Sequence, residues 1–361
     1  MPLDGWKEKL FQRYLAWTCR PARIRRHLRS ALPGSFPAGV KKTADRRKIR
    51  AAAVQVKLTL HKSPLQFADE MHRRVREAVD EGAILVAFPE YNNLPLLGLL
   101  PGIEKIEESY RQKAENPGSA SADEDKQQED IKLTDVFHYM SPAVKPLVDT
   151  VFSSLAEAYK IHIMAGSYTL ADNGSVVNRS FLYGPSGKML GDQDKVHLLP
   201  VEEEWQLKRG DSFNSYDTSI GRLALPVCMD ATYFETFRIL EQKETDIVLL
   251  PIANQEEYNY WLALRGIWPR VQESRLYGVK SALVGSIAGL TFSGKSGIYA
   301  PLELTEQKDG VLAEVKPHDR EALAVADLDL EALHELRRND PWRDKNPALY
   351  RRYFPAIYLN K

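Results

Sequence analysis

Three side chains that could cooperate in acyl transfer occur along this chain in the order Glu, Lys, Cys. Glu90 ends an apolar run that begins at Ala83, and Cys228 ends a second run that begins at Leu223. Lys195 lies between them in the sequence and enters a turn that closes at a proline. Apolar runs of this length are typical of buried strands, so we expect Glu90 and Cys228 to lie at strand ends and Lys195 to lie in a turn.

The chemistry of such a set follows from the functional groups. A thiol must lose its proton to attack a carbonyl carbon, and a carboxylate with a raised proton affinity can take that proton. The carbonyl oxygen becomes negative during attack, and a fixed ammonium group stabilises it best where water is excluded. We therefore assign Glu90 as the base, Lys195 as the group that stabilises the oxyanion, and Cys228 as the nucleophile. The expected intermediate is a thioester acyl-enzyme.

Each residue taken alone has a simpler explanation. A cysteine after an apolar run is often a small buried hydrophobe, as Cys228 could be. Glu90 could be a carboxylate at a helix N-terminus, and Lys195 could be a surface charge. The catalytic interpretation depends on the three occurring together.

The segments around these residues resemble the motifs of the nitrilase or carbon-nitrogen hydrolase superfamily. The similar segments are Phe88-Pro-Glu90, Lys195-Val-His-Leu and Cys228-Met-Asp230-Ala-Thr-Tyr-Phe-Glu235, with further support from residues 270–273, 293–296 and 323–330. The resemblance covers residues 49–361. It implies an α/β fold, a four-layer α-β-β-α sandwich with the catalytic residues at one end of two sheets.

The resemblance also implies a fourth site residue. The family often has a second glutamate eight positions after the lysine, which is Glu203 in this chain. There it would orient Lys195 and the substrate. Glu203 stands between Glu202 and Glu204, so the alternative is a solvated acidic turn before Trp205.

The reaction is narrowed by the residues after the nucleophile. True nitrilases usually carry Trp-Glu there, whereas this chain has Met229-Asp230, which resembles the amidase and carbamoylase branch. Our leading hypothesis is a cysteine amidase that hydrolyses a linear, non-peptide amide. One alternative is an N-acyltransferase that uses the same site, with an acyl donor held at a membrane. Another is a catalytically silent binding or scaffold protein.

Composition agrees with a globular enzyme. Hydrophobic residues make up 43% of the chain, charged residues 27%, and the formal net charge is zero, which gives no global attraction to nucleic acid. Two cysteines far apart provide neither a disulfide framework nor metal-ligand spacing, so we expect a reducing, cytoplasmic compartment. The sequence has no long apolar run and no secretory segment at its start. The proposed chemistry implies no cofactor.

Short apolar runs alternate with amphipathic stretches, as in α/β domains. The predicted strands are residues 50–56, 84–88, 162–167, 176–183, 223–228, 246–251, 281–286 and 323–328, and helices are predicted at 66–81 and 143–159. Residues 49–361 form the predicted hydrolase domain. Within it, the polar segment at about 104–132 is predicted to be a mobile insertion, either a lid or an idle surface loop.

Residues 1–48 form an N-terminal extension. At helical spacing, one stripe gathers the apolar and aromatic residues Leu3, Trp6, Leu10, Tyr14 and Trp17. Lysine and arginine greatly outnumber acidic residues over the first 32 positions. This pattern predicts a basic amphipathic helix that brings residues 1–30 to a membrane surface as a peripheral contact. The alternative is docking of this helix on its own domain or on a second subunit.

The resemblance further implies self-association. Members of the family commonly pair through helices that follow the nucleophile, and the aromatic-rich segment 258–277 has a similar placement. The C-terminal segment 346–354 resembles tails that lie across a partner subunit. We therefore expect a homodimer or a higher homo-oligomer, with a small amide as substrate and no nucleic acid partner.

Overall fold

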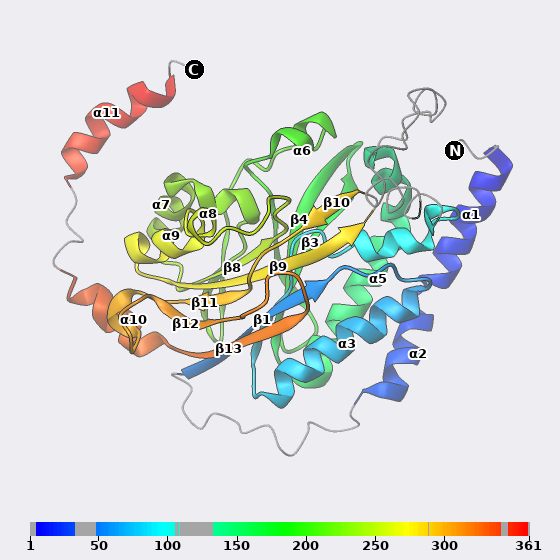
Figure 1. Ribbon diagram of the computed structural model, residues 1–361, viewed down its shortest axis with the longest axis horizontal. Helices are drawn as coiled ribbons and strands as arrows, with labels where there is room; N and C mark the ends of the chain where they lie inside the picture. The colour runs from blue at the N-terminus through cyan, green and yellow to red at the C-terminus, as the bar shows by residue number, and fades with distance from the viewer. Residues whose placement is uncertain are drawn as a thin grey trace.

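The computed structural model describes residues 5–32, 48–104, 108, 133–287, 289–340 and 346–359. Its strands form a continuous sheet that folds into two facing halves, joined where β1 (Lys48–Lys57) runs parallel to β9 (Tyr277–Ile287) (Figure 1). Val56 of β1 pairs with Leu283 of β9 at this junction. The junction brings residues more than 200 positions apart in the sequence into one sheet.

In the first half the strand order is β5-β4-β3-β2-β1, and β13 pairs with β1 in the antiparallel direction. β1, β2 and β3 are parallel, with Ala52 opposite Val86 and Val86 opposite Ile163. The added strands are β2 (Leu85–Ala87), β3 (His162–Asp172), β4 (Ser175–Tyr183), β5 (Met189–Asp194) and β13 (Ala322–Asp329).

The second half has the order β9-β8-β7-β6, with β7, β8 and β9 parallel. Three short antiparallel strands complete it around β9. Its strands are β6 (Ser215–Thr218), β7 (Gly221–Ala224), β8 (Ile247–Ile252), β10 (Leu290–Phe292), β11 (Gly297–Tyr299) and β12 (Val311–Glu314).

Small residues allow the two halves to pack face to face. Ala51 and Ala53 of β1 point into the space between the sheets together with Leu249 of β8, because alternate residues of a strand face opposite sides. Ala52 and Val54 face outward into a separate cluster beneath the helices. Because its side chains alternate in this way, β1 contributes residues to two separate buried clusters.

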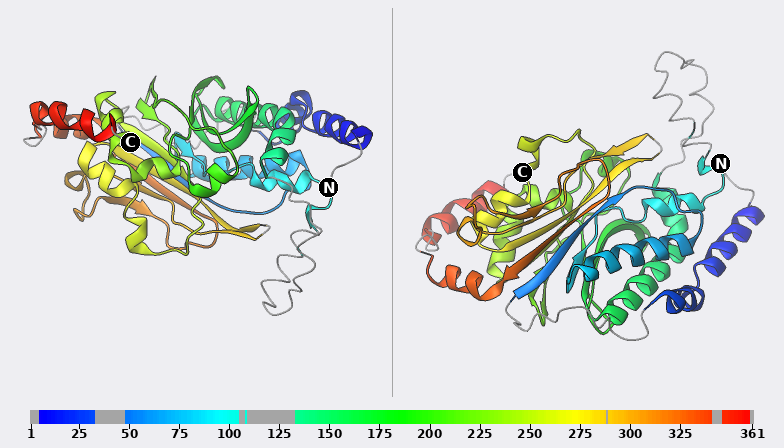
Figure 2. Two further views of the ribbon diagram at one scale, coloured as in Figure 1. Left: turned by 90° about the horizontal axis from the view of Figure 1, so that it is seen from above. Right: turned by 60° about the horizontal axis from the view of Figure 1, so that its bottom comes forward.

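Helices cover both outer faces, and Figure 2 shows them on opposite sides of the sheets. α3 (Pro64–Asp80) and α5 (Leu133–Tyr159) pack against the first half, while α7 (Phe234–Gln242), α8 (Tyr260–Ala263) and α9 (Ile267–Ser274) lie on the second. The remaining elements are η1 (Leu94–Leu99), α6 (Pro200–Glu204), η2 (Cys228–Thr232), η3 (Leu302–Leu304), α10 (Leu330–Arg338) and α11 (Pro347–Leu359). Three buried clusters separate four layers, so the predicted α-β-β-α sandwich is confirmed.

The predicted strands and helices occur in the structure with shifted ends. The helix predicted at 143–159 begins ten residues earlier, at Leu133. The shift that bears on the site concerns the strand predicted at 223–228, because β7 ends at Ala224. Pro226 has no backbone N–H for a sheet ladder, which favours the end of the strand before it. Cys228 is therefore separated from the strand by an irregular segment.

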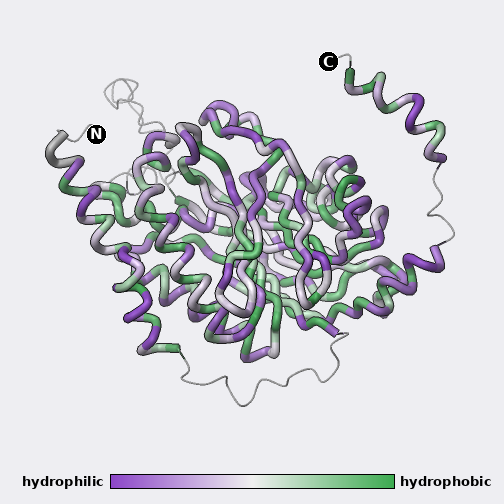
Figure 3. The backbone as a smooth tube through the Cα atoms, turned by 180° about the vertical axis from the view of Figure 1, so that it is seen from behind, coloured by the Kyte–Doolittle hydropathy of each residue, from purple (hydrophilic) through white to green (hydrophobic). Residues whose placement is uncertain are grey.

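The N-terminal helices α1 (Gly5–Thr18) and α2 (Pro21–Ala31) dock on their own domain, against α5 and α3. Leu15 of α1 and Ile24 and Leu28 of α2 are buried in this contact. The predicted stripe faces elsewhere: Leu10, Tyr14 and Trp17 are 60%, 52% and 52% exposed. Figure 3 shows polar and apolar residues interleaved along both helices. The side chains of the first two residues of the stripe lie outside the described residues.

Most of the predicted insertion at about 104–132 also lies outside the described residues. Glu104 at its start is paired with Lys62, with 2.9 Å between the carboxylate oxygen and Nζ. Among the described residues, no helix is long and apolar enough to cross a membrane.

Candidate active site

Cys228 occupies a strained turn after β7. Its φ of +46° lies in the left-handed region, which non-glycine residues rarely adopt. The carboxylate of Asp230 holds the turn by accepting the backbone N–H of Val227 at 2.9 Å. Cys228 is a partly buried residue, and its Sγ lies 3.8 Å from Oδ1 of Asn254. The turn thus lifts Sγ out of the sheet and holds it in place.

Glu90 and Lys195 meet next to this turn, completely buried. Glu90 follows the carboxyl end of β2, and Lys195 follows β5 directly. Nζ of Lys195 donates to Oε1 of Glu90 at 2.9 Å. Nδ2 of Asn178 on β4 donates to the same oxygen at 2.9 Å. The other oxygen, Oε2, is buried without a hydrogen-bond partner among the described residues, so it can accept a proton.

The three residues form one electrostatic unit. Burial raises the pKa of the Glu90 carboxyl; the Lys195 ammonium opposes this rise and the neighbouring Glu202 carboxylate adds to it. Burial also raises the pKa of the Cys228 thiol, with Glu90 adding to the rise and Lys195 opposing it. Burial disfavours the charge on Lys195, but Glu90, Cys228 and Glu202 outweigh it and raise its pKa. Lys195 is therefore a permanent cation, and Glu90 a carboxyl with enhanced proton affinity.

The structure brings together Glu90, Lys195 and Cys228 but leaves Glu203 out of the cluster. Glu203 points to the surface, where its carboxylate pairs with Arg209. Glu202 takes the place predicted for it: Nζ of Lys195 donates to its carboxylate at 2.8 Å. The prediction of Glu203 was wrong by one residue.

The cause of the shift is the start of α6. Glu202 is the third residue of this helix, and its carboxylate turns back to accept the backbone N–H of Leu199 at 2.7 Å. This turn directs the side chain inward, and the next residue, Glu203, points about 100° further round the helix. The capping pattern of a glutamate three positions after a helix boundary was the signal that could have identified Glu202.

Two further residues were missed in the sequence. The hydroxyl of Tyr91 donates to the Glu202 carboxylate, and its backbone is left-handed with φ +52°. Asn178 lies between the two carboxylates, and its Nδ2 is 3.4 Å from Glu202. A single asparagine within a strand gives no distinctive sequence signal, although a buried amide in a sheet needs polar partners.

Asp230 links the loop of Cys228 to the loop of Lys195. Its carboxylate accepts the backbone N–H of His197 at 2.8 Å and lies 2.9 Å from the Nδ1 of the same residue. The His197 ring stacks on Tyr233, with 4.0 Å between the ring centroids. Through these contacts Asp230 and His197 hold the two loops against each other.

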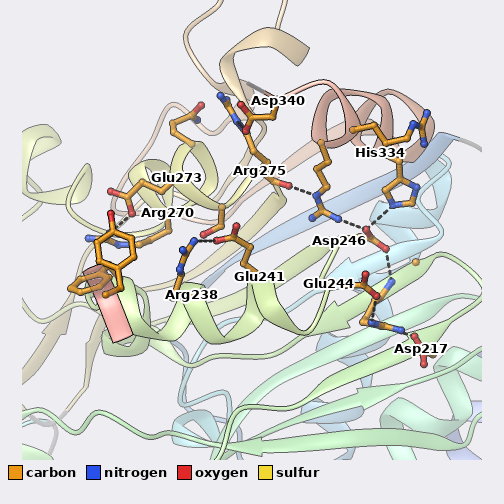
Figure 4. A pocket seen from close by; sticks show the side chains of 18 of the residues that line it. Asp217, Arg238, Glu241, Glu244, Asp246, Arg270, Glu273, Arg275, His334 and Asp340 are labelled. Carbon is orange, nitrogen blue, oxygen red and sulfur yellow. Dashed lines mark hydrogen bonds and ion pairs between the residues drawn. The ribbon is translucent and has the colours of Figure 1, made fainter. Parts of the chain in front are cut away.

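Cys228 lines a cavity of about 370 Å³ between the second sheet and the segment that leads into α8 and α9. A larger cavity of about 990 Å³ lies elsewhere, between α7, α9, α10 and α11 (Figure 4). Charged pairs line the larger one, including Arg238 with Glu241 and Arg270 with Glu273. Because the thiol opens into the smaller cavity, that cavity is the candidate active site.

Comparison with known proteins agrees with this geometry. The family model for carbon-nitrogen hydrolases matches residues 50–338, a span that contains all of the cluster described above. The chain belongs to the carbon-nitrogen hydrolase family. It is accordingly a carbon-nitrogen hydrolase enzyme.

The relatives include amidases. The chain is 26% identical to the omega-amidase NIT2 of Homo sapiens over 313 residues, which cover 83% of this chain and 96% of that protein. It is 29% identical over 195 residues to the probable hydrolase YhcX of Bacillus subtilis, covering 53% of this chain but 38% of that longer relative.

Solved structures share the fold. The carbon-nitrogen hydrolase of Helicobacter pylori G27 superposes with a TM-score of 0.60 at 20% identity, covering 85% of this chain and 98% of that one. A mutant of the amidase from Nesterenkonia sp. AN1, with the acetamide moiety of fluoroacetamide added at its active-site cysteine, has a TM-score of 0.59 at 18% identity and covers 89% of this chain and 100% of that one.

Proposed function

We propose that this hydrolase is a cysteine amidase that cleaves a linear, non-peptide amide through a thioester acyl-enzyme. The observation that carries the proposal is the strained, cavity-facing Cys228 beside a buried Glu90 and Lys195. The curated relative named as an omega-amidase supports an amide as the substrate class.

The first half of the reaction makes the thioester. Glu90 accepts the thiol proton through Oε2 as Sγ of Cys228 bonds to the amide carbon and the carbonyl electron pair moves onto oxygen. The Lys195 ammonium stabilises this oxyanion. Because Lys195 is completely buried, water does not screen the interaction. When the carbon-oxygen double bond reforms, the carbon-nitrogen bond breaks, and Glu90 returns its proton to the departing amine.

The second half releases the acid. Glu90 takes a proton from water, the hydroxide oxygen bonds to the thioester carbon, and the carbon-sulfur bond breaks. The proton returns to sulfur and the free thiol is restored. An amine that replaced water would give acyl transfer by the same steps, so the fate of the thioester separates the two activities.

Glu202 acts as a positioning residue in this proposal. It accepts a hydrogen bond from the Lys195 ammonium, as Glu90 does, so the lysine keeps its charge and its place as the proton moves between sulfur and Glu90. Tyr91 and Asn178 in turn fix Glu202. The site residues carried forward are therefore Glu90, Lys195 and Cys228, with Glu202 in place of Glu203.

Intact-protein mass spectrometry tests the proposal. Wild-type protein and Cys228→Ala are incubated with short, long-chain and carbamoyl amides, with and without an acceptor amine. We expect an acyl adduct on wild type that is absent from the variant, and its mass identifies the acyl group. Conversion of the adduct to acid supports hydrolysis, and conversion to a new amide supports transfer. No adduct and no turnover with any amide contradicts the proposal and favours a binding protein.

We also propose that the chain forms a homodimer. Large apolar side chains are exposed on α8 and α11, including Trp261 at 76% and Leu359 at 79%. α11 contacts α7 through Phe354, whose ring lies 6.4 Å from that of Phe234. Light scattering coupled to size exclusion tests the mass, and a monomer at all micromolar concentrations contradicts the proposal.

The exposed stripe of α1 supports a third proposal, a peripheral contact with anionic membranes. Its three exposed members leave the docked face of α1 free to hold the domain. Exposed arginines of α2 lie next to it, among them Arg25, Arg26 and Arg29. Aromatic and basic side chains together suit an anionic headgroup boundary.

A further inference from the structure

Four buried side chains on the inner face of β3 and β4 carry polar atoms that lack a protein partner. The atoms are Oγ of Ser167, Oγ1 of Thr169, Oδ1 of Asn178 and Oγ of Ser180, and none of these residues is more than 1% exposed. They make up half of the eight buried side-chain polar atoms without a hydrogen-bond partner in the part of the chain that the structure describes. Because an unsatisfied buried polar group is costly, their concentration in one place indicates a shared ligand that the protein itself does not supply.

The strand register places these four side chains next to one another. In the antiparallel pairing of β3 with β4, Ser167 lies opposite Ser180, and Thr169 lies opposite Asn178. Residues opposite each other share a face of the sheet, and so do residues two positions apart, so all four side chains point to the same side. That side is the space between the two sheets, because Leu182, two positions after Ser180, belongs to the cluster buried there.

The spacing of the four residues suits a single water molecule. Their Cβ atoms form a rectangle of about 5 by 7 Å, because opposite residues are about 5 Å apart and alternate residues of one strand about 7 Å apart. The centre of the rectangle is about 4 Å from each Cβ atom, which matches the reach of a hydroxyl group and one hydrogen bond. A water at the centre can donate to Oδ1 of Asn178 and to one hydroxyl and accept from the other two hydroxyls, which satisfies all four atoms.

The neighbouring amide on β5 is committed to other contacts. Gln193 pairs with Ser180 across β4 and β5, on the side of β4 away from β3. Nε2 of Gln193 donates to the carbonyl of Ser212 at 2.6 Å, and Oε1 accepts the backbone N–H of Asn214 at 2.9 Å. Gln193 therefore does not provide the partner that the Ser180 hydroxyl lacks.

Asn178 and Ser167 join this cluster to the candidate active site. Nδ2 of Asn178 donates to Oε1 of Glu90 at 2.9 Å and lies 3.4 Å from the Glu202 carboxylate, so Oδ1 of the same amide points away from both carboxylates. The backbone N–H of Ser167 donates to the carbonyl of Pro89, the residue before Glu90, at 3.2 Å. A partner for Oδ1 therefore fixes the orientation of the amide that contacts Glu90.

We propose that the hydroxyls of Ser167, Thr169 and Ser180 hold a buried water molecule whose hydrogen bond to Oδ1 keeps the Asn178 amide turned toward Glu90. The three hydroxyl residues are positioning residues, because they act on Glu90 only through the water and Asn178. Their effect on the reaction rests on the proposed amidase function, whereas the water site itself does not. Loss of one hydroxyl weakens the water site, frees the amide to turn and weakens its hydrogen bond to Glu90.

A crystal structure of the wild-type protein, at a resolution that shows ordered water, tests the site without any substrate. We expect a water within about 3.2 Å of Oδ1 of Asn178 and of at least two of the three hydroxyl oxygens. If other buried waters are visible and this position holds none, the proposal is overturned. Hydroxyls that bond to one another or to backbone carbonyls instead would also overturn it.

Variants of Thr169 test the effect of the water site on Glu90. Thr169→Val removes the hydroxyl and keeps the shape of the side chain, whereas Thr169→Ser keeps the hydroxyl and removes a methyl group. Thr236→Val is the matched control: the Thr236 hydroxyl is also buried without a partner among the described residues, but it belongs to α7 on the outer face of the second half. The measurements are the pH dependence of Cys228 alkylation by iodoacetamide, which needs no substrate, and of kcat/KM for the amide that is hydrolysed.

We expect the acid limb of both pH profiles to move to higher pH by about 0.5 to 1 unit in Thr169→Val. A donor to a carboxylate favours its charged form, so a weaker hydrogen bond from the Asn178 amide raises the pKa of Glu90, which must be unprotonated to accept the thiol proton. Thr169→Ser and Thr236→Val should keep the wild-type pH dependence, because the first retains the hydroxyl and the second lies outside the cluster.

The other titratable groups next to Glu90 stay unchanged in these variants. They are Lys195, Glu202, Cys228 and Tyr91. A shift of the acid limb therefore reports the water site and its amide. Ser180→Ala removes a second hydroxyl from the same site, should shift the limb in the same direction, and replaces Thr169→Val if that variant does not fold.

The outcomes separate this inference from the amidase proposal. An unchanged acid limb in Thr169→Val, or an equal shift in Thr236→Val, rejects the positioning role and leaves the amidase function standing if amides are hydrolysed. If no amide is hydrolysed, the amidase proposal fails, and the crystal structure and the alkylation profile still decide the inference.

Discussion

Replacing Glu202 by Gln tests the assignment that the structure changed. The Glu202 carboxylate accepts hydrogen bonds from four donors: Nζ of Lys195, the hydroxyl of Tyr91, Nδ2 of Asn178 and the backbone N–H of Leu199. A glutamine amide has one oxygen and one NH₂ group. The NH₂ group of the new side chain must therefore face at least one of these donors without accepting its hydrogen bond.

The size of the effect follows from this mismatch. Breaking a completely buried pair and leaving donors unsatisfied costs about 3 to 5 kcal/mol. Lys195 would then pair with Glu90 alone, and a closer ammonium lowers the pKa of Glu90 and weakens it as a base. We expect Glu202→Gln to lose about 3 kcal/mol of unfolding free energy and about a hundredfold in kcat.

Glu203→Gln is the matched control. Its carboxylate is 49% exposed and pairs with the 60% exposed Arg209, and pairs of this kind contribute about 0 to 1 kcal/mol. Urea denaturation gives the free energies, and the rate of amide hydrolysis gives kcat. If Glu203→Gln were inactive while Glu202→Gln kept wild-type activity, the assignment from the start of α6 would be refuted.

Three further predictions concern other parts of the chain. Iodoacetamide should label Cys228 well before Cys19, because Cys228 lines a cavity beside the carboxylate of Glu90, whereas Cys19 is 2% exposed. Mass spectrometry of peptides gives the order, and faster labelling of Cys19 contradicts the site. Replacing both Tyr14 and Trp17 by Ser should abolish sedimentation of the protein with vesicles that contain anionic lipid. The melting temperature of the variant should stay within a few degrees of the wild-type value, because both side chains are exposed. Unchanged sedimentation rejects membrane contact. The pKa of Lys280 is about 8 in the folded state and 10.5 in its usual range, so the folded state binds fewer protons than the unfolded state between these pH values. The unfolding free energy of the wild type should therefore rise by up to about 3 kcal/mol relative to that of Lys280→Met as the pH rises from 8 to 10.5. Urea denaturation measures this difference, and a difference that does not change with pH contradicts the buried lysine.

The local sequence was sufficient to predict the positions of most strands and of two helices. Apolar runs located the strands because a strand buried on both faces needs consecutive apolar residues. The ends of these runs located Glu90 and Cys228, because polar side chains are more frequent where a buried strand ends. The resemblance of three separate motifs to one family supplied their common function and the order of the layers.

Contacts between distant segments decided the rest. The choice between Glu202 and Glu203 depends on the direction in which α6 leaves its first turn, and neighbouring glutamates are equivalent in the sequence. The N-terminal stripe predicted an amphipathic helix, but only the structure shows that a different face, with Leu15, docks on the domain.

The sequence by itself determined which groups are available for the proposed chemistry: a thiol, a carboxylate and an ammonium group, each close to the end of a strand. Tertiary structure decided which groups share a site. Asn178 and Lys280 lie within strands and look in the sequence like isolated polar interruptions. They acquire meaning only when sheet pairing places Asn178 between two carboxylates and Lys280 on the wall of the Cys228 cavity. The physical reason is that burial and electrostatics depend on neighbours in space, and β-sheet pairing selects those neighbours from distant parts of the chain.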